Sequence, residues 1–391
     1  MSTSPTILQI FLAALRLGCT SFGGPVAHLA YFRRDYVEQR RWLTERDYAD
    51  LVALCQFLPG PASSQTGFGI GYLQRGWRGG LAAWAGFTLP SAVLMIAFAL
   101  GLGRFGAFVG SGWLHGLKLA AVAVVAQAVL AMWRSLAWDA ARSALVLAGA
   151  GALLALPYAW MQVAVIAAGA LAGRLLFAGG DTGNPGSASA SPPFPRASPI
   201  LLGVVLLLLV ALPASVRMMN NAWLAQADTF YRAGALVFGG GHVVLPLLER
   251  ELVVPGGVTP DQFLAGYGAA QAVPGPLFTF AAYLGAAQHG VRCGLWTLVW
   301  IFLPGLLLVP AALPVWQRLR EDASAQAAMR GANAAVVGVL LAALITPVGQ
   351  AALTDGRSAA VAAAAFAALQ LARLPSWAAV LACAAAGALF A

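Results

Sequence analysis

The sequence predicts an all-α polytopic membrane protein made of two inverted-topology repeats that contain discontinuous helices. Of the 391 residues, 60% are hydrophobic and 9% are charged, whereas about 25% are charged in an ordinary soluble domain. Charge-free runs, such as residues 81–103 and 331–354, reach the roughly 20 residues needed to cross the hydrocarbon core of a bilayer. The motifs of the first half also recur in the second half.

The apolar runs divide into about thirteen candidate transmembrane segments, on either side of a polar linker. The linker spans residues 179–199 and is rich in Gly, Ser and Pro, a composition that cannot bury a core. It separates an N-terminal repeat, residues 1–178, from a C-terminal repeat, residues 200–391. The segments lie near residues 7–32, 51–74, 80–103, 117–133, 142–157, 158–177, 199–216, 223–248, 262–288, 293–316, 331–353, 358–372 and 375–391.

The two repeats match over about 75 residues with two single-residue gaps. Residues 16–24 recur as residues 232–240, residues 56–61 as residues 271–276, and Leu89-Pro90 as Leu303-Pro304. About seven crossings separate the two starts, and an odd number inserts the repeats in opposite orientations, as in many secondary transporters. The distribution of arginines among the loops gives conflicting indications of which side of the membrane the N-terminus faces. We expect the N-terminus inside, because residues 33–50 balance five acids against five arginines.

Proline and glycine inside the apolar segments predict four helix breaks, in two matching pairs. A proline removes a backbone donor and breaks the helix, which is tolerated at membrane depth where the freed backbone lines a cavity. A half-helix that restarts there directs unpaired N–H groups and a partial positive charge at the break, which suits an anion. The alternative is that these residues only permit close helix packing. The motifs are Phe22, Gly23, Gly24 and Pro25; Pro59, Gly60 and Pro61; Phe238, Gly239, Gly240 and Gly241; and Pro274, Gly275 and Pro276.

Arg16 and Arg232 are the candidate ligands for the charge of an anion. Arg16 falls about 14 Å into the first segment at 1.5 Å per residue, and a charge at that depth is by default a functional hypothesis. Two guanidiniums facing each other across a pseudo-twofold axis would suit a tetrahedral dianion. The alternatives are that Arg16 extends to the surface and that Arg232 pairs with Asp228 one helical turn earlier.

Polar side chains beside the breaks complete the candidate site. His28 and His242 follow the two Phe-Gly-Gly motifs and suit oxyanion hydrogen bonding, proton coupling or simple helix packing. Gln56 and Gln271 precede the two Pro-Gly-Pro motifs, where they would orient a ligand or cap a broken helix. Hydroxyl donors follow these motifs at Ser63, Ser64 and Thr279.

Several other classes of protein are disfavoured. The net charge of +9 comes from scattered arginines without an RNA-binding motif, which argues against nucleic acid. Four cysteines without close spacing indicate no metal or disulfide framework. An integral-membrane enzyme would need a convergent cofactor, metal or thiol site, so we expect no enzyme and no cofactor. No cleaved signal peptide is expected, since residues 1–6 hold no cationic region.

Residues 22–43, 48–72, 238–253 and 271–285 together resemble the chromate ion transporter family in its long, two-domain bacterial form. The resemblance covers nearly the whole chain outside the linker. It implies a multi-pass protein of the bacterial inner membrane that exports chromate and confers resistance, with chromate and the lipid bilayer as partners. Sulfate has the same charge and nearly the same shape, so a sulfate transporter or channel remains open, as does a homodimer.

Overall fold

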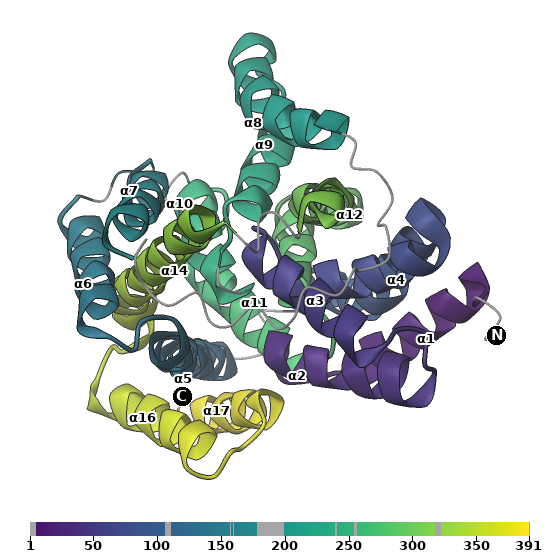
Figure 1. The fold of residues 1–391 in the computed structure, drawn as a ribbon. Coiled ribbons are helices and arrows are strands. Elements are labelled where there is room, and N and C mark those ends of the chain that lie inside the picture. Colours follow the sequence, from purple (N-terminus) through teal and green to yellow (C-terminus); the bar gives the residue numbers. More distant parts are fainter. Residues whose placement is uncertain are drawn as a thin grey trace.

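The fold is an assembly of packed helices, without any strand among the residues that the structure describes (Figure 1). A computed structural model describes residues 5–105, 111–156, 158, 160–177, 199–238, 241–253, 256–316 and 322–390. The predicted linker lies outside these ranges except for Pro199, the first residue of α8. All thirteen predicted segments contain helices, which are interrupted at the breaks near residues 21–23, 58–61, 236–238 and 273–276, and the expected all-α class is confirmed.

The helices of the two halves follow the same order apart from the π-helix of the first half and α15 of the second, and α8 (Pro199–Met219) stands between the halves. The first half comprises α1 (Ile7–Thr20), α2 (Gly24–Phe32), a π-helix (Arg33–Gln39), α3 (Glu45–Phe57), α4 (Ala62–Phe105), α5 (Ser111–Leu136), α6 (Ala140–Ala155) and α7 (Met161–Leu176). The second half comprises α9 (Ala222–Ala235), α10 (Val244–Leu252), α11 (Pro260–Ala272), α12 (Phe280–Ala312), α14 (Ala323–Ala343), α15 (Gln350–Ala352), α16 (Gly356–Gln370) and α17 (Ser376–Phe390). Short helical turns at Gly241–Val243, Leu277–Thr279, Leu313–Val315 and Leu344–Gly349 complete it.

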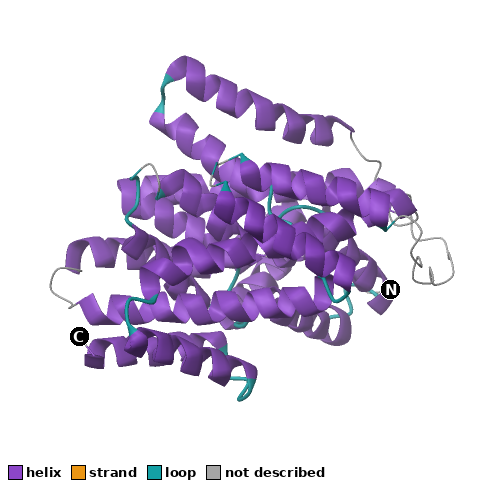
Figure 2. Cartoon of the chain, turned by 90° about the vertical axis from the view of Figure 1, so that its left-hand side faces the viewer, coloured by secondary structure: helices purple, strands orange, loops and turns teal. Residues whose placement is uncertain are grey.

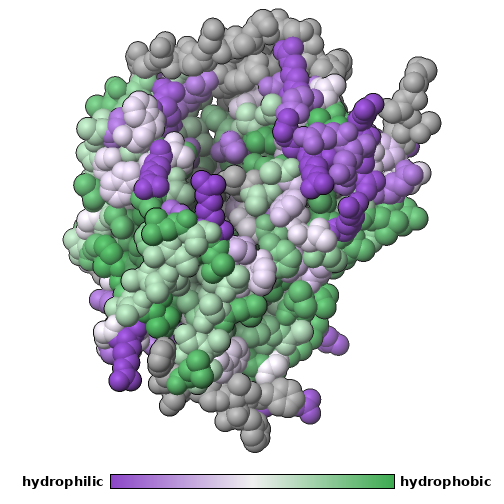
Figure 3. All heavy atoms as spheres, turned by 90° about the horizontal axis from the view of Figure 1, so that it is seen from below, coloured by the Kyte–Doolittle hydropathy of each residue, from purple (hydrophilic) through white to green (hydrophobic). Residues whose placement is uncertain are grey.

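The surface and the helix lengths fit a membrane protein. In the described ranges, five helices are long and apolar enough to cross a bilayer: residues 62–104, 112–136, 199–219, 277–315 and 323–352. Apolar side chains form a broad region across the middle of the face in Figure 3, while hydrophilic ones gather towards its ends. Figure 2 shows the N-terminus and the C-terminus at opposite ends of the helices. The chain is therefore a multi-pass membrane protein.

Two of the long helices are sharply kinked at equivalent places. Backbone torsions leave the helical region at Arg75 and Gly76 in α4, and again at His289 and Gly290 in α12, 214 residues later. Gly76 and Gly290 have positive φ values of 58° and 77°, which only glycine adopts at little cost. Each kink is thus a turn between two helices, as the separate segments 51–74 and 80–103 predict.

The first two segments of each half are hairpins, not crossings. Gln74 Nε2 donates to the Trp42 carbonyl at 2.7 Å, and Arg75 Nε donates to the Pro5 carbonyl at 2.8 Å. The pairs α1–α2 and α3–α4 therefore begin and end on one face of the molecule, which we call the α1 face. Gln226 Nε2 likewise donates to Gln288 Oε1 at 2.6 Å, which brings the start of α9 to the turn in α12.

The two halves still have opposite orientations in the bundle, although the first two segments of each half are hairpins. Between the starts of α1 and α9, the crossing elements are the second part of α4, then α5, α6, α7 and α8. These are five crossings where the segment count gave seven, and both numbers are odd. The start of α9 therefore lies at the other end of the bundle, which we call the α9 face.

Reciprocal hydrogen bonds join the breaks of the two halves. The Gly60 N–H donates to the Val237 carbonyl at 2.7 Å, and the Gly275 N–H donates to the Ser21 carbonyl at 2.9 Å. Gly60 and Gly275 are equivalent in the repeat, and so are Ser21 and Val237. A twofold axis produces this reciprocity, so each half supplies the backbone partner that the other half's broken helix lacks.

The last helices of each half pack on the other half. The backbone of α7 at Gly169 and Gly173 touches α14 at Gly331, and α17 at Cys383 and Gly387 touches α5 at Gly116. Glycine allows this close approach because it has no side chain, as in many membrane helix pairs. The halves are therefore interlocked.

Replacing Gly331 by valine is expected to destabilise the folded protein by roughly 2–3 kcal/mol, because the new side chain would overlap the Gly169 carbonyl and the Gly173 backbone. Loss of monodisperse protein on heating, followed by size-exclusion chromatography, measures the effect. Gly151→Val is the control, since nothing lies within 4 Å of a Cβ at Gly151 on α6. Equal heat resistance of the two variants would contradict the interlocked packing.

Candidate functional site

The break between α1 and α2 is built from two glycines in the left-handed region. Gly23 and Gly24 have φ values of 101° and 79°, which turn the chain back after Thr20. Gly23 is the N-cap of α2 and makes no side-chain capping bond, and Pro25 occupies the first turn. The N–H groups that begin α2 are thus left without a side-chain cap, as the sequence predicts for a half-helix that faces an anion.

A cavity of about 330 Å³ lies at this break. Its volume equals that of about ten water molecules, enough for a tetrahedral oxyanion with part of its hydration shell. It joins both halves, because α2, α5 and residues around the α9–α10 and α11–α12 breaks all contribute. The lining residues are Gly23, Gly24, Pro25, Val124, Gln127, Ala128, Ala131, Met132, His242, Gln271 and Ser376.

A narrow extension continues the cavity between the breaks. Gly23, Gly24, Gln271 and Ser376 also line this smaller space of about 20 Å³, together with Gly275 of the second Pro-Gly-Pro motif. Six of the residues predicted for the site therefore line these two connected spaces: Gly23, Gly24 and Pro25 of one half and His242, Gln271 and Gly275 of the other.

The polar groups around this cavity are neutral dipoles. Among its described lining residues, no Lys, Arg, Asp or Glu occurs. Gln127, Gln271 and Ser376 present amides and a hydroxyl, which donate hydrogen bonds to oxyanion oxygens. Dipoles held in a low-dielectric site act strongly on a charge, so the cavity can attract an anion without a resident cation.

His242 is held in place by a tyrosine from α11. His242 Nδ1 lies 2.7 Å from the hydroxyl of Tyr267, which is fully buried. When the tyrosine donates this bond, the remaining proton of the neutral imidazole is on Nε2. His242 then offers the cavity an N–H donor.

A second group of polar side chains is buried behind the first break. His28 Nδ1 lies 3.4 Å from Ser63 Oγ, and the His28 ring packs edge-on against Phe87. Ser21 Oγ, His28 Nε2 and Ser64 Oγ are buried without a hydrogen-bond partner in the described ranges. Buried polar atoms usually find partners, so these atoms are available to bound water beside the cavity.

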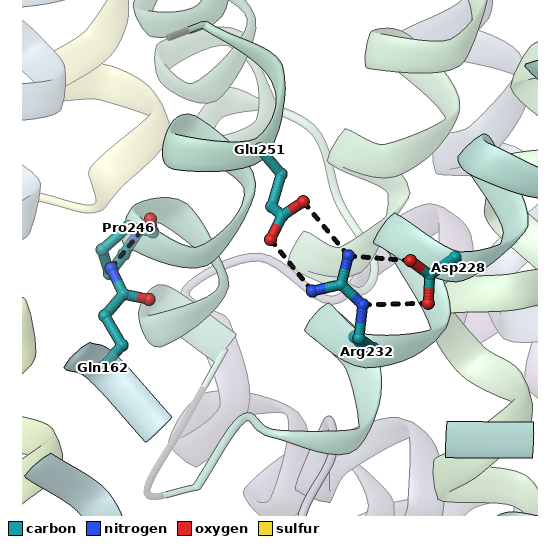
Figure 4. A network of polar contacts seen from close by, with 5 residues as sticks. All are labelled: Gln162, Asp228, Arg232, Pro246 and Glu251. Carbon is teal, nitrogen blue, oxygen red and sulfur yellow. Dashed lines mark hydrogen bonds and ion pairs between the residues drawn. The ribbon is translucent and has the colours of Figure 1, made fainter. Parts of the chain in front are cut away.

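Arg232 is bound by two carboxylates (Figure 4). Its Nε and Nη2 donate to Asp228 at 2.9 Å each, and its Nη1 and Nη2 donate to Glu251 at 3.0 and 3.2 Å. Four of its five N–H groups are thereby used, and the group of three carries a net negative charge. The expected pair of anion-binding guanidiniums is therefore not formed, and the alternative pairing with Asp228 is the one observed.

The model of the chromate transporter family matches residues 8–174 and, a second time, residues 224–388. The chain belongs to the chromate transporter family. The double match covers both halves and leaves out the linker and all of α8.

Curated relatives extend over most of this family member. A chromate transport protein of Pseudomonas aeruginosa is 27% identical over 85% of this chain and 79% of its own length. A chromate transport protein of Cupriavidus metallidurans is 28% identical over 88% of this chain and 83% of its own length. An uncharacterized transporter of Methanocaldococcus jannaschii is 23% identical over 88% and 84%. No solved structure matches.

Several residues predicted for the site of this chromate transporter family member lie away from the cavity. Arg16 is exposed on α1, and Gln56 is exposed beside a groove between Arg33 and Tyr48. Phe22 packs its ring on Trp377, and Phe238 is half-buried. Gly239 and Gly240 lie outside the described residues. Pro59, Gly60, Pro61, Pro274 and Pro276 form the breaks, while Gly241 and Thr279 are buried beside them.

Gln127 and Ser376 are lining residues that were not among the site residues predicted from the sequence. Gln127 is the one amide in the apolar run of residues 119–132, and Ser376 is the first residue of α17. A polar residue in the middle of a long apolar helix indicates a functional site, and Gln127 could have been found in this way.

Proposed function

We propose that this family member exports chromate from the cytoplasm across the bacterial inner membrane and thereby confers chromate resistance. The observation that supports this proposal best is the cavity at the α1–α2 break, in which an uncapped helix start meets neutral donors from both halves. Names of relatives support chromate as the cargo. Sulfate remains the second candidate, because a cavity lined by uncharged donors suits both tetrahedral dianions.

Anion binding would rest on the dipoles around the cavity. The start of α2 and the donors Gln127, His242, Gln271 and Ser376 would replace part of the hydration shell of a tetrahedral dianion. A dianion loses much of its hydration free energy in such a site, so several donors must converge on it. The glycines at positions 23 and 24 let the backbone itself approach the oxygens.

Export would be favoured by the membrane potential. Moving one charge through 100 mV is worth about 2.3 kcal/mol, so a dianion that leaves a negative interior gains about 4.6 kcal/mol. A movement of the halves about their pseudo-twofold axis would expose the cavity to the two faces in turn, as in other transporters with inverted repeats. We propose transport without an enzymatic step.

Flux of labelled chromate into everted membrane vesicles tests this function. We expect uptake that depends on the protein and saturates with chromate, because everted vesicles convert export into accumulation. Excess sulfate is expected to compete, since it has the same charge and nearly the same shape as chromate. Strong sulfate uptake with little chromate uptake would make the protein a sulfate transporter. A lack of flux for both anions would remove the proposal.

A further inference from the structure

The polar lining of the cavity at the α1–α2 break is only partly repeated in the sequence of the other half. The repeat relates Gln127 to Ala342, His242 to Val26, and, from the glycine contacts of α7 and α17, Ser376 to Gln162. Two of the four polar positions therefore become apolar in the second copy, while Gln271 and Ser376 have the polar equivalents Gln56 and Gln162. The pseudo-twofold axis relates the backbones but only part of the chemistry of the two places.

Gln162, the equivalent of Ser376, is polar, but its amide already has a hydrogen-bond partner. Gln162 has an exposed fraction of 2%, and its Nε2 donates to the Pro246 carbonyl of α10 at 3.1 Å (Figure 4). Its amide N–H is therefore committed to the backbone near the second break. Beside it lies a space of only about 30 Å³, lined by Gln162, Arg232 and Glu251 among others. Its lining also includes Arg250, and Arg232 is already bound to Asp228 and Glu251, so its guanidinium has few donors left for an anion.

Ser376 sits towards the α1 face. It opens α17, whose far end, at Cys383 and Gly387, packs on Gly116 at the start of α5. Since α5 begins on the α9 face, α17 begins on the α1 face. Ser376 itself is half-buried and lines both parts of the cavity. We therefore expect the cavity to be entered from the α1 face in this conformation.

We propose that the cavity at the α1–α2 break is an oxyanion site in which Gln127 and Ser376 are ligands that determine affinity. This inference rests on the proposed transport function. Gln127 approaches from α5 of the first half and Ser376 from α17 of the second. Their amide and hydroxyl donors supplement the start of α2, while Tyr267 holds His242 in the same cavity.

The first test measures the KM of chromate flux in everted vesicles. Gln127→Ala and Ser376→Ala are each expected to raise KM about tenfold, since each removes a hydrogen bond to a charged ligand. Ser376→Thr keeps the hydroxyl and is expected to retain a KM near that of the wild type. Gln39→Ala deletes an exposed amide on the π-helix and serves as the matched control.

The second test measures access and occupancy without transport. In a Cys19→Ser background, which removes the exposed cysteine, Ser376→Cys is labelled with a membrane-impermeant thiol reagent added to one face at a time. Sulfate and molybdate, tetrahedral dianions that do not oxidise thiols, are the protecting ligands. We expect labelling at least tenfold faster from the α1 face, slowed by either anion. Leu371→Cys, in the exposed turn before α17, should be labelled from the same face without protection.

The outcomes separate this inference from the proposed function. Wild-type flux together with unchanged KM in both alanine variants would overturn the roles of Gln127 and Ser376. Labelling of Ser376→Cys that neither anion slows would also overturn the site. Protection of Ser376→Cys in a protein that shows no flux would keep the binding site and remove the exporter.

Discussion

Replacing Arg232 by alanine is expected to destabilise the folded protein by about 2–3 kcal/mol. The substitution leaves Asp228 and Glu251 facing each other without their shared cation, and breaking a buried ion pair costs about 3–5 kcal/mol. The lower value allows for the exposed fraction of the Arg232 side chain, which is 32%. The reason is electrostatic, because the two carboxylates have exposed fractions of only 8% and 29%. Heat resistance in detergent, read by size-exclusion chromatography, measures the change.

Two further variants give this prediction its control. Arg16→Ala removes the repeat-related arginine, whose side chain is exposed, and should change stability by no more than about 0.5 kcal/mol. Combining Arg232→Ala with Glu251→Gln removes one of the stranded charges and should recover part of the loss. If Arg232→Ala and Arg16→Ala proved equally heat resistant, the ion pairs would not stabilise the α9–α10 hairpin.

Replacing Gly275 by valine is expected to reduce chromate flux at least tenfold. Gly275 has a φ of 102°, and a Cβ there would lie 2.8 Å from Ser91 Oγ and 3.3 Å from the Phe87 carbonyl. The left-handed backbone costs a residue with a side chain about 1–2 kcal/mol, and overpacking adds about 1–3 kcal/mol. The chain would relieve this strain by moving the break that lines the cavity. Flux per folded protein in vesicles is the measurement.

Gly101→Ala is the control for the glycine substitution. Gly101 lies in α4 with nothing within 4 Å of a built Cβ, and alanine in place of glycine inside a helix adds roughly 0.5–1 kcal/mol of stability. Its flux should therefore match the wild type. Normal flux in Gly275→Val would mean that the exact path of this break has no part in transport.

The helix breaks could be predicted from the sequence because their causes are local. A proline that lacks an N–H and a glycine that adopts positive φ act within a few residues. Accordingly, α1 ends at Thr20 and α3 at Phe57, each just before a predicted motif. The repeat was equally visible, since the matching motifs keep their spacing. These two signals are sufficient for the fold class.

The direction of the chain after each break could not be predicted in this way. An apolar run of about 25 residues either crosses a bilayer or turns back inside it, and its composition is the same in both cases. The bonds from Gln74 to Trp42 and from Arg75 to Pro5 decide the matter. These contacts span 32 and 70 residues, which no local pattern reveals.

The candidate site was predicted in its backbone and partly missed in its side chains. Arg232 pairs with Asp228 one turn away, which the spacing allows, but Glu251 joins them only because α10 folds back along α9. The predicted depth of Arg16 and Arg232 in the membrane suggested that a guanidinium binds the anion. The cavity instead offers only uncharged donors. Comparing the repeats residue by residue would have identified Gln127, because its counterpart is Ala342.

The hydrogen bonds that Gly60 and Gly275 donate to the opposite half imply that neither half can complete its fold alone. A chain cut within residues 178–198 would leave the first half without the Val237 carbonyl and the second without that of Ser21. Each fragment would expose an unsatisfied amide at membrane depth, where water is not available to replace the bond. Two separate half-length chains would therefore have to insert upside down with respect to each other before either could complete its fold.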